Sequence, residues 1–303
     1  MLAETMSGET VCIVGAGFMG AQIALHCASY GFEVRLVDIA PEALERAEES
    51  QARDLANLVK EGRVPAHEHG AILRRIRRGQ DLAQGAGGAA FVIEAVPERL
   101  ELKRALFAEL DGICPARTIL ASNSSSLRIS SIESATRRPD RVLNMHFYAP
   151  VWQHPMVDLM RGTGTSEQTF ETARQFALRM GLLPLVVRKE STGFVFNRIW
   201  RAIKKESLRV VESGVASHED VDRAWMVFLG QPTGPFGMMD RIGLDVVRDI
   251  EMVYYRESGD PSDAPPRVLL DKIEKGELGV KTGKGFYGYP NPAYQDPAFL
   301  KPR

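Results

Sequence analysis

Residues 11–38, VCIVGAGFMGAQIALHCASYGFEVRLVD, decide the fold. The apolar run 11–14 is typical of a buried strand, and a glycine-rich segment follows it at once. Residues 18–30 have the apolar spacing of a helix, and residues 33–37 alternate polar and apolar side chains as a second strand does. A strand, a glycine turn, a helix and a strand in this order predict the first unit of a parallel α/β sheet.

The glycine-rich segment predicts a dinucleotide site at the start of the helix. Gly15 permits the tight turn, Gly17 lets the backbone approach a pyrophosphate, and Gly20 lets the helix pack closely on the strand. Phe18 and Met19 open the helix, where free N–H groups and the helix dipole favour an anion.

The second strand ends at Asp38, 18 residues after Gly20. A carboxylate at this place accepts hydrogen bonds from the ribose hydroxyls of adenosine and repels a 2′-phosphate. No arginine follows it closely, so the sequence predicts NAD rather than NADP as the cofactor.

Alternation of strands and helices continues through the first part of the chain and then stops. Further strands are predicted at residues 91–95, 118–121, 142–145 and 185–187, and helices at 42–60 and 100–110. Beyond residue 187 the pattern is helical, with helices at 194–213, 218–228 and 243–256 and a glycine- and proline-rich break at 230–237. We therefore expect a doubly wound, mostly parallel sheet in residues 1–189 and an all-helical domain in residues 190–303.

Composition excludes several classes of partner. The 303 residues are 44% hydrophobic and 25% charged, with a formal net charge of −1, so we expect neither nucleic acid nor a membrane surface as a partner. The three cysteines are scattered, which favours a reducing compartment and argues against disulfides or a bound metal. The polar N-terminus does not resemble a signal peptide, and no apolar run is long enough to span a membrane. We expect a cytoplasmic protein.

One local charge cluster stands out, RRIRR at residues 74–78. A solvated helix end is the favoured interpretation, and a site for an anionic ligand is the alternative.

Two polar segments suggest a reaction centre. The stretch 146–158, HFYAPVWQHPMVD, places a histidine and a carboxylate twelve residues apart, and a histidine with an acidic partner is a candidate for proton transfer. The segment ASNSSSL, residues 121–127, follows a predicted strand, where a doubly wound sheet places ligands, although a serine-rich helix cap is an equal alternative.

With these segments in view, the chain resembles the NAD-dependent L-3-hydroxyacyl-CoA dehydrogenase family, in particular its 3-hydroxybutyryl-CoA dehydrogenases. The resemblance covers nearly the whole length, and its matching pieces are GAGFMG (15–20), EAVPERLELK (94–103), ASNSSSL (121–127), HFYAP (146–150), TGFVFNR (192–198), GPFGMMDRIGLD (234–245) and KTGKGFYGY (281–289). It implies a Rossmann domain followed by a helical domain through which the protein forms a homodimer.

The resemblance also implies roles for single residues. His146 is the implied base that takes the proton of the 3-hydroxyl, and Asp158 is the carboxylate that orients it. Ser125 and Asn197 are implied to hydrogen-bond the substrate near its reacting carbonyl. Contacts to NAD are implied for three further residues: Glu98, Lys103 and Lys281.

The sequence departs from the family pattern close to the histidine. Asp158 stands where the family has glutamate, and Ala149 stands where it has asparagine. Pro155 resembles relatives that oxidise free 3-hydroxy acids, such as carnitine and gulonate dehydrogenases. On the helix after Asp38, Asp54 falls near the position of a CoA-binding serine, and Lys60 is one residue away from that of a CoA-binding lysine.

The sequence is therefore compatible with three functions. The leading hypothesis is oxidation of a 3-hydroxyacyl-CoA, reversible and dependent on NAD. The second is a dehydrogenase of a small free 3-hydroxy or 3-keto acid, or of an acyl group on a carrier protein. The third is an NAD-binding protein without catalysis, against which the presence of His146, Ser125 and Asn197 argues.

Overall fold

The computed structural model describes residues 9–301, which form two compact units. The units divide between Val195 and Phe196, six residues after the predicted boundary at residue 189. The expectation that the N-terminus is not a signal peptide concerns residues 1–8, which lie outside the described residues.

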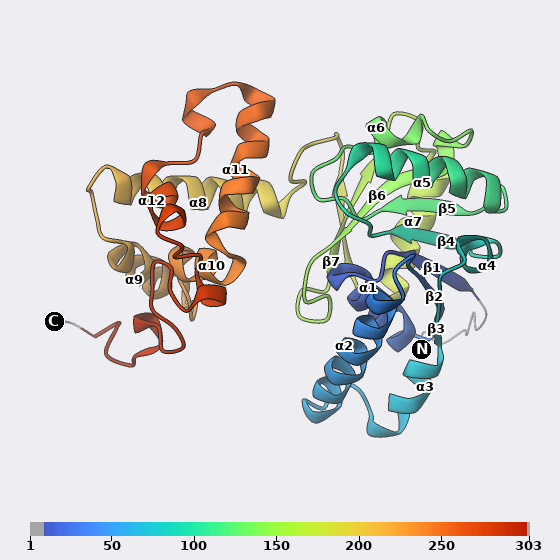
Figure 1. The fold of residues 1–303 in the computed structure, drawn as a ribbon, viewed down its shortest axis with the longest axis horizontal. Helices are drawn as coiled ribbons and strands as arrows, with labels where there is room; N and C mark the ends of the chain where they lie inside the picture. The colour runs from blue at the N-terminus through green and yellow to red at the C-terminus, as the bar shows by residue number, and fades with distance from the viewer. Residues whose placement is uncertain (1–8, 302–303) are drawn as a thin grey trace. The chain divides into compact units, whose positions relative to one another are not determined.

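The first unit is built on one eight-stranded sheet (Figure 1). Its order is β3-β2-β1-β4-β5-β6-β7-β8, and every neighbouring pair is parallel except β6 and β7. The strands are β1 (Thr10–Val14), β2 (Glu33–Val37), β3 (Ile76–Gly79), β4 (Phe91–Glu94), β5 (Ile119–Ser122), β6 (Val142–Phe147), β7 (Met156–Arg161) and β8 (Leu183–Val187). The predicted doubly wound, mostly parallel sheet is confirmed.

Helices cover both faces of this sheet. Successive strand residues point to opposite faces, and the apolar residues on each face are buried in a separate core. Val11 and Ile13 belong to one core, and Cys12 and Val14 belong to the other. The first core is closed by α1 (Phe18–Ser29), α2 (Pro41–Lys60), α3 (His69–Arg74) and α7 (Glu167–Arg179). The second is closed by α4 (Leu82–Ala86), α5 (Leu100–Ile113) and α6 (Ser130–Glu133).

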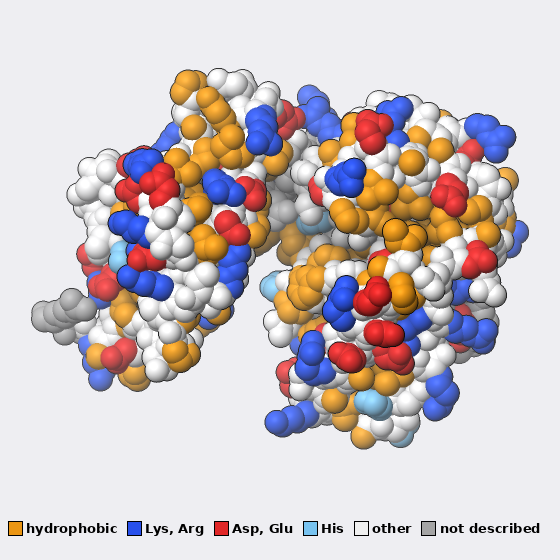
Figure 2. Space-filling view, in the orientation of Figure 1, with side chains coloured by type: hydrophobic (Ala, Val, Ile, Leu, Met, Phe, Trp, Pro, Cys, Tyr) orange, Lys and Arg blue, Asp and Glu red, His pale blue; other side chains and the backbone are white. Residues whose placement is uncertain are grey.

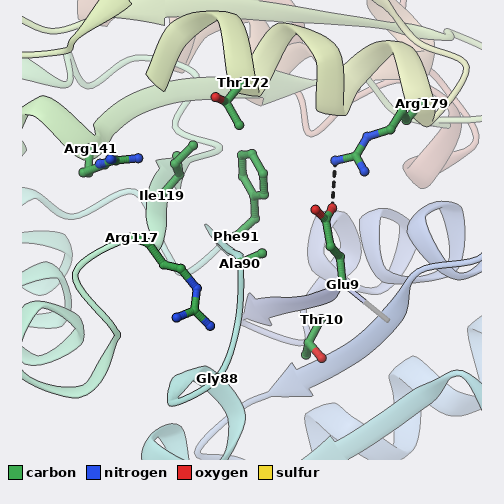
Figure 3. A pocket seen from close by; sticks show the side chains of 10 residues that line it. All are labelled: Glu9, Thr10, Gly88, Ala90, Phe91, Arg117, Ile119, Arg141, Thr172 and Arg179. Carbon is green, nitrogen blue, oxygen red and sulfur yellow. Dashed lines mark hydrogen bonds and ion pairs between the residues drawn. The ribbon is translucent and has the colours of Figure 1, made fainter. Parts of the chain in front are cut away.

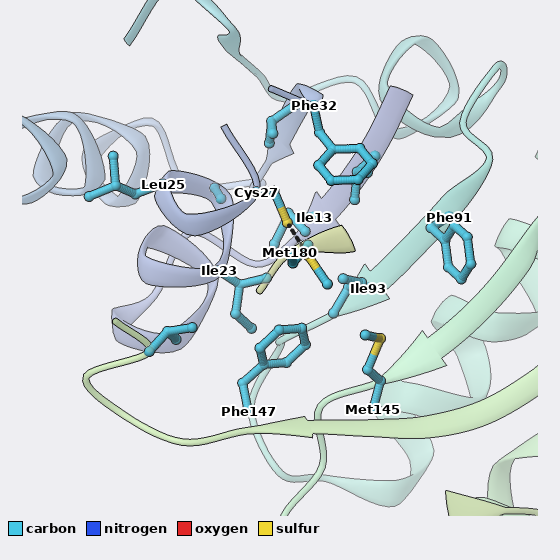
Figure 4. Close-up of a cluster of buried hydrophobic side chains, with 14 of the residues drawn as sticks. Ile13, Ile23, Leu25, Cys27, Phe32, Phe91, Ile93, Met145, Phe147 and Met180 are labelled. Carbon is cyan, nitrogen blue, oxygen red and sulfur yellow. Dashed lines mark hydrogen bonds between the residues drawn. The ribbon is translucent and has the colours of Figure 1, made fainter. Parts of the chain in front are cut away.

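Large apolar side chains from distant parts of the chain meet in the first core. Figure 4 shows Ile13 and Ile93 from central strands in one cluster with Ile23 of α1, Met180 and Phe147. All five side chains are nearly inaccessible to solvent. This packing fixes β6 and the polar residues that it presents at its carboxyl end.

Two strands were absent from the sequence prediction. The cluster 74–78, interpreted as a solvated helix end, instead spans the last residue of α3 and most of β3, so this interpretation was wrong. Ile76 is the one buried apolar residue of β3, which pairs with β2 at the edge of the sheet. A short, charged edge strand has almost no apolar pattern to detect. The other missed strand, β7, has Asp158 in its buried middle.

The second unit is helical, as predicted. Its helices are α8 (Phe196–Glu212), α9 (His218–Leu229), α10 (Pro235–Ile242), α11 (Leu244–Ser258) and α12 (Arg267–Glu274). They enclose a core that includes Leu208, Phe236 and Val247, all without solvent exposure. Pro235 opens α10, where the prediction had a helix break through residue 237, because proline is well placed in the first turn of a helix.

Two aspartates of this unit bind backbone groups of the sequence motifs at 234–245 and 281–289. Asp240 of α10 accepts hydrogen bonds from the backbone N–H groups of Phe286 and Tyr287, both at 2.9 Å. Asp222 of α9 accepts from the N–H groups of Phe236 and Gly237 at the start of α10, at 2.8 and 3.0 Å. These bonds fasten the C-terminal segment to the helices.

None of the helices in the described part of the chain is long and apolar enough to cross a membrane. On the face seen in Figure 2, basic and acidic side chains are interspersed over both units. This distribution agrees with the net charge of −1.

Candidate active site

The glycine loop lies at the carboxyl end of β1, and its three glycines have different surroundings. Gly15 has a φ of +106°, and a Cβ there would lie 2.6 Å from the carbonyl oxygen of Ala95. A Cβ on Gly20 would lie 1.8 Å from the carbonyl oxygen of Gly15. A Cβ on Gly17 would meet nothing within 4 Å. Two glycines are thus needed by the protein itself, and Gly17 leaves open space beside the loop.

This open space fits a pyrophosphate. Gly17 is the N-cap of α1 and offers no side chain to the free N–H groups of the first turn, which Phe18 and Met19 begin. Uncapped N–H groups at a helix start bind anions. Phe18 is 71% exposed, so its N-terminal turn faces solvent.

Asp38 braces the same loop from the end of β2. Its carboxylate accepts hydrogen bonds from the N–H groups of Ala16, at 2.7 Å, and Ala40, at 2.9 Å. These bonds hold the carboxylate next to the glycine loop, where ribose hydroxyls are expected. The glycine loop and Asp38 together therefore fit NAD.

A buried ion-pair network lies at the end of the next strand. Lys103 of α5 is 1% exposed, and its ammonium contacts Glu94 of β4 and, at 3.2 Å, Glu98. Glu94 has no exposed surface and also accepts from the Ser122 hydroxyl at 2.7 Å. Glu94 and Ser122 were not singled out in the sequence, because a carboxylate inside an apolar strand gives no local sign of its partner.

Glu98 organises the serine-rich segment after β5. It accepts hydrogen bonds from the Ser124 hydroxyl and from the backbone N–H and hydroxyl of Ser126, the last two at 2.9 and 2.8 Å. Burial raises the pKa of Glu98, but the Lys103 charge and these hydrogen bonds outweigh burial and lower the pKa to about 2. Glu98 is therefore ionised at neutral pH and holds the segment in place, and Ser125 is exposed between its two bound neighbours.

His146 and Asp158 are directly opposite each other on the antiparallel strands β6 and β7. Opposite residues point to the same face of a sheet, which explains how twelve residues of separation bring the two side chains together. His146 Nδ1 lies 3.3 Å from Asp158 Oδ2. His146 is 5% exposed and Asp158 is 0% exposed. The Phe194 ring stacks on the imidazole, with centroids 4.8 Å apart.

A third residue joins this pair. The Tyr148 hydroxyl donates a hydrogen bond to the same Asp158 oxygen, and the Tyr148 ring meets His146 edge-on at 4.7 Å. A contact between Tyr148 and Asp158 was not predicted from the sequence. A usable sign was present, since residues two apart in a strand point to the same face.

The serine segment is tied directly to the histidine strand. The Asn123 side-chain oxygen accepts a hydrogen bond from the Phe147 N–H at 2.9 Å. The glycine loop, Glu98, the serine segment and His146 thus lie at the carboxyl ends of four adjacent strands, β1, β4, β5 and β6. Parallel sheets bind their ligands at this edge.

A cavity of about 310 Å³ lies at the opposite, amino ends of the strands (Figure 3). Arg117, Arg141 and Arg179 line it, and Arg179 pairs with Glu9 at 2.8 Å. This cavity is remote from the strand ends that hold the predicted residues.

Two predicted residues belong to the second unit. Asn197 is the second residue of α8. Lys281 pairs with both carboxylate oxygens of Asp245 at 2.6 Å and is about half exposed. Their roles toward substrate and cofactor stay predictions.

Comparison with known proteins shows the family of this chain. Residues 10–191 match the family model for the 3-hydroxyacyl-CoA dehydrogenase NAD-binding domain, and residues 193–289 match the model for the C-terminal domain of the same family. The chain belongs to the 3-hydroxyacyl-CoA dehydrogenase family. It is an oxidoreductase with NAD as its cofactor, as predicted.

Individual members of the 3-hydroxyacyl-CoA dehydrogenase family agree over almost the full chain. A protein of Bacillus subtilis named probable 3-hydroxybutyryl-CoA dehydrogenase is 38% identical over 94% of this chain and 98% of its own length. The crystal structure of (S)-3-hydroxybutyryl-CoA dehydrogenase from Ralstonia eutropha has a TM-score of 0.87 and 35% identity, covering 93% of this chain and 99% of that one. A diketoreductase structure has a TM-score of 0.83 and 34% identity, covering 93% of this chain and 99% of that one.

The residues on α2 that were expected to contact CoA differ from the family pattern. Asp54 is partly exposed and lies 3.8 Å from Arg53, and burial raises its pKa. Just beyond α2, the Arg63 guanidinium donates to the carbonyl of Trp152. This bond joins the end of α2 to the loop between the histidine and aspartate strands.

The alternative anionic site at residues 74–78 is largely occupied by the protein itself. Arg75 donates to the Ala28 carbonyl at 3.1 Å, and Arg78 donates to the Gln51 side chain at 2.6 Å. Burial lowers the pKa of Arg78. Arg75 and Arg78 thus fasten the turn before β3 and β3 itself to neighbouring helices, whereas Arg77 is exposed.

Proposed function

We propose that the protein oxidises an L-3-hydroxyacyl-CoA to the 3-ketoacyl-CoA, reversibly, with His146 as the general base. The observation that supports this most is the buried pair of His146 and Asp158 at the sheet edge that also holds the glycine loop. Oxidation of a secondary alcohol needs a hydride acceptor and a proton acceptor together. NAD supplies the hydride acceptor when it is bound.

The proton-accepting role follows from the two nitrogens of the imidazole. When Nδ1–H donates to Asp158, the lone pair of Nε2 is free to take the proton of the substrate hydroxyl. The imidazolium that results is stabilised by the carboxylate across the strand pair. In the reducing direction the same nitrogen returns the proton to the 3-keto oxygen.

The other site residues are proposed to position the reactants. Ser125, exposed in a segment anchored by Glu98, and Asn197 on α8 are assigned to the substrate oxygen. Glu98 and Lys103 are assigned to the NAD side of the site, with Lys103 acting through Glu98 because its ammonium is enclosed by protein oxygens. Lys281 is assigned to the cofactor through the family resemblance.

His146→Gln tests the role of the base. We expect turnover to fall by roughly 10²–10⁴-fold, because general base catalysis contributes this much and glutamine cannot accept the proton. NADH binding, followed by its fluorescence, should stay within twofold of wild type. A variant that retains more than a tenth of the activity would show that another group is the base.

A second substrate class has its own support. Ala149 and Pro155 depart from the acyl-CoA pattern, and Ala149 removes a polar side chain next to the catalytic strand. The diketoreductase relative, which acts on dicarbonyl compounds, is nearly as similar to this chain as the 3-hydroxybutyryl-CoA dehydrogenase of Ralstonia eutropha is. Free 3-keto acids and carrier-bound acyl groups are therefore the alternative substrates. Comparing kcat/KM for acetoacetyl-CoA with that for free acetoacetate decides between the thioester and the free acid.

We also propose a homodimer formed through the second unit. Its surface exposes several large apolar side chains, and apolar groups gather over the α11 region in Figure 2. Phe228 is 89% exposed, Val227 is 67% exposed, and Ile199 is 56% exposed. Large apolar side chains exposed on α8 and α9 support a protein interface on this unit.

A cytoplasmic location is proposed from the cysteines. Cys12, Cys27 and Cys114 are all buried and unbridged. Burial raises the pKa of each thiol, to about 12, 12 and 11. Free thiols are typical of a reducing compartment.

A further inference from the structure

Asp158 is held by a tyrosine as well as by the histidine. Its Oδ2 accepts from the Tyr148 hydroxyl and faces His146 Nδ1 at 3.3 Å. Its Oδ1 is buried and has no hydrogen-bond partner within residues 9–301. One oxygen therefore receives both donors, and the orientation of the carboxylate depends on them alone.

The distance between the imidazole and the carboxylate makes the tyrosine important. Charge-assisted N–H···O bonds are about 2.7–2.9 Å long, so 3.3 Å is a loose contact for such a pair. A bond this long does little to fix a buried carboxylate. The Tyr148 hydroxyl is the second restraint, and its ring also contacts the edge of the imidazole.

We propose that Tyr148 is a positioning residue that holds Asp158 toward His146 and moderates the charge that Asp158 presents. The proposal rests on the proposed role of His146 as the base. A hydroxyl that donates to a carboxylate withdraws negative charge from it, so the imidazolium gains less stabilisation. Tyr148 thereby favours the neutral imidazole, the form that accepts a proton from the alcohol.

The surroundings of His146 leave few other groups to produce this effect. The described titratable groups in contact with its ring are Asp158 on β7 and Tyr148 after β6. Phe194 covers the ring from the segment that follows β8, and it has no charge. No metal-binding cluster of histidine, cysteine, aspartate or glutamate occurs in the described chain.

The length of the acid gives the proposal a specific test. Asp158→Glu lengthens the side chain by one methylene, about 1.5 Å, and lets the carboxylate reach the imidazole without the help of the tyrosine. In the wild-type background, Tyr148→Phe should lower kcat for oxidation at pH 6 by about tenfold, on the scale of one lost hydrogen bond to a charged group. In the Asp158→Glu background the same substitution should change kcat by less than twofold.

The pH profile supplies a measurement that a purely structural role would not move. Loss of the Tyr148 hydroxyl should shift the midpoint of the acid limb of kcat/KM upward by about half a unit to one unit. Replacement of Tyr148 by 3,5-difluorotyrosine, which keeps its shape and donates more strongly, should shift that midpoint downward. Opposite shifts from the two replacements identify charge moderation, and the fluorinated protein keeps the test valid even where Tyr148→Phe fails to fold.

Controls separate this proposal from the assignment of the base. Tyr30→Phe removes a hydroxyl from a half-exposed tyrosine that follows α1 and should leave the midpoint unchanged. Equal effects of Tyr148→Phe in both backgrounds, or an unmoved midpoint with both replacements, would overturn the positioning role while His146→Gln stays inactive. An active His146→Gln would instead overturn the proposed base.

Discussion

At the scale of single residues, the two glycines at positions 17 and 20 lack a side chain for different reasons. Gly20 has no room for a side chain within the protein, because a Cβ would lie 1.8 Å from the Gly15 carbonyl oxygen. Gly17 has no protein atom within 4 Å of the Cβ position and an ordinary backbone φ of −70°. No protein atom therefore requires a glycine at this position, which supports the proposed contact of Gly17 with the pyrophosphate.

This difference predicts opposite outcomes for the same substitution. Gly17→Ala should leave the free energy of unfolding within about 0.5 kcal/mol of wild type and should weaken NADH binding at least tenfold, about 1.4 kcal/mol. Gly20→Ala should cost about 1–3 kcal/mol of stability through overpacking. Urea denaturation and NADH fluorescence titration measure both quantities. Normal NADH affinity in Gly17→Ala would place the pyrophosphate elsewhere.

Glu98 gives a prediction about pH. Its pKa lies at about 2 in the folded protein and at about 4.5 in the unfolded chain, so its stabilising effect is complete above pH 4.5 and is lost as the pH falls through 2. Glu98→Gln should lower the free energy of unfolding at pH 7 by about 1–2 kcal/mol, after allowance for the partial exposure of this side chain. Unfolding curves of both proteins should converge toward pH 2. A constant difference from pH 7 to pH 2 would contradict the assigned ion pair.

Residue identities at the site were predictable where a local pattern specifies them. The glycine loop and Asp38 lie just after strands, His146 lies near the carboxyl end of β6, and all of them belong to motifs that the sequence shows. The hydrogen bonds of Tyr148, Glu94 and Asn123 were not predicted, because their partners lie on other strands. A sequence pattern records the face of a strand but not which polar groups meet across it.

At the scale of elements, buried aspartates connect the helices of the second unit to its C-terminal segment. Asp240 of α10 is 1% exposed and receives two backbone N–H groups of the segment at Phe286 and Tyr287. The Tyr289 hydroxyl adds a third bond at 3.1 Å. The glycines of this motif follow from the same contact, since a Cβ on Gly285 would lie 2.1 Å from the Asp240 side chain.

Asp240→Ala should therefore destabilise the second unit. Loss of the acceptor leaves buried N–H groups unpaired, at a cost of about 1–3 kcal/mol each. Thermal denaturation should show a clear drop in Tm, whereas Asp249→Ala, at an exposed aspartate of α11, should change it little. Equal Tm values for the two variants would remove this role from Asp240.

The elements themselves were predicted unevenly. Apolar periodicity was sufficient for β1, β2, α1 and most of α8, whose side chains face a core on one side. It failed for β3 because an edge strand with one apolar side chain, two arginines and a glycine shows no apolar alternation. It misplaced the start of α8 by two residues because Phe194 adopts a φ of +52°, a local backbone conformation that the sequence does not indicate.

At the scale of the whole molecule, the apolar surface of the second unit predicts self-association. Phe228→Asp places a charge on the most exposed large apolar side chain of α9 and should shift the protein from dimer to monomer in sedimentation velocity. Leu183→Asp, a similar change at an exposed leucine of the first unit, should leave the dimer intact. A dimeric Phe228→Asp protein, or a monomeric wild type, would contradict the proposed interface.

The proposed reaction of the whole molecule is the oxidation of a 3-hydroxyacyl-CoA by NAD, with His146 and Asp158 handling the proton. The most direct measurement is NADH oxidation by the purified wild-type protein with acetoacetyl-CoA and, in parallel, with free acetoacetate. We expect turnover with acetoacetyl-CoA, with a kcat/KM at least a hundredfold higher than with the free acid, which is about 2.7 kcal/mol of transition-state discrimination. Turnover with the free acid and none with acetoacetyl-CoA would contradict the proposed reaction.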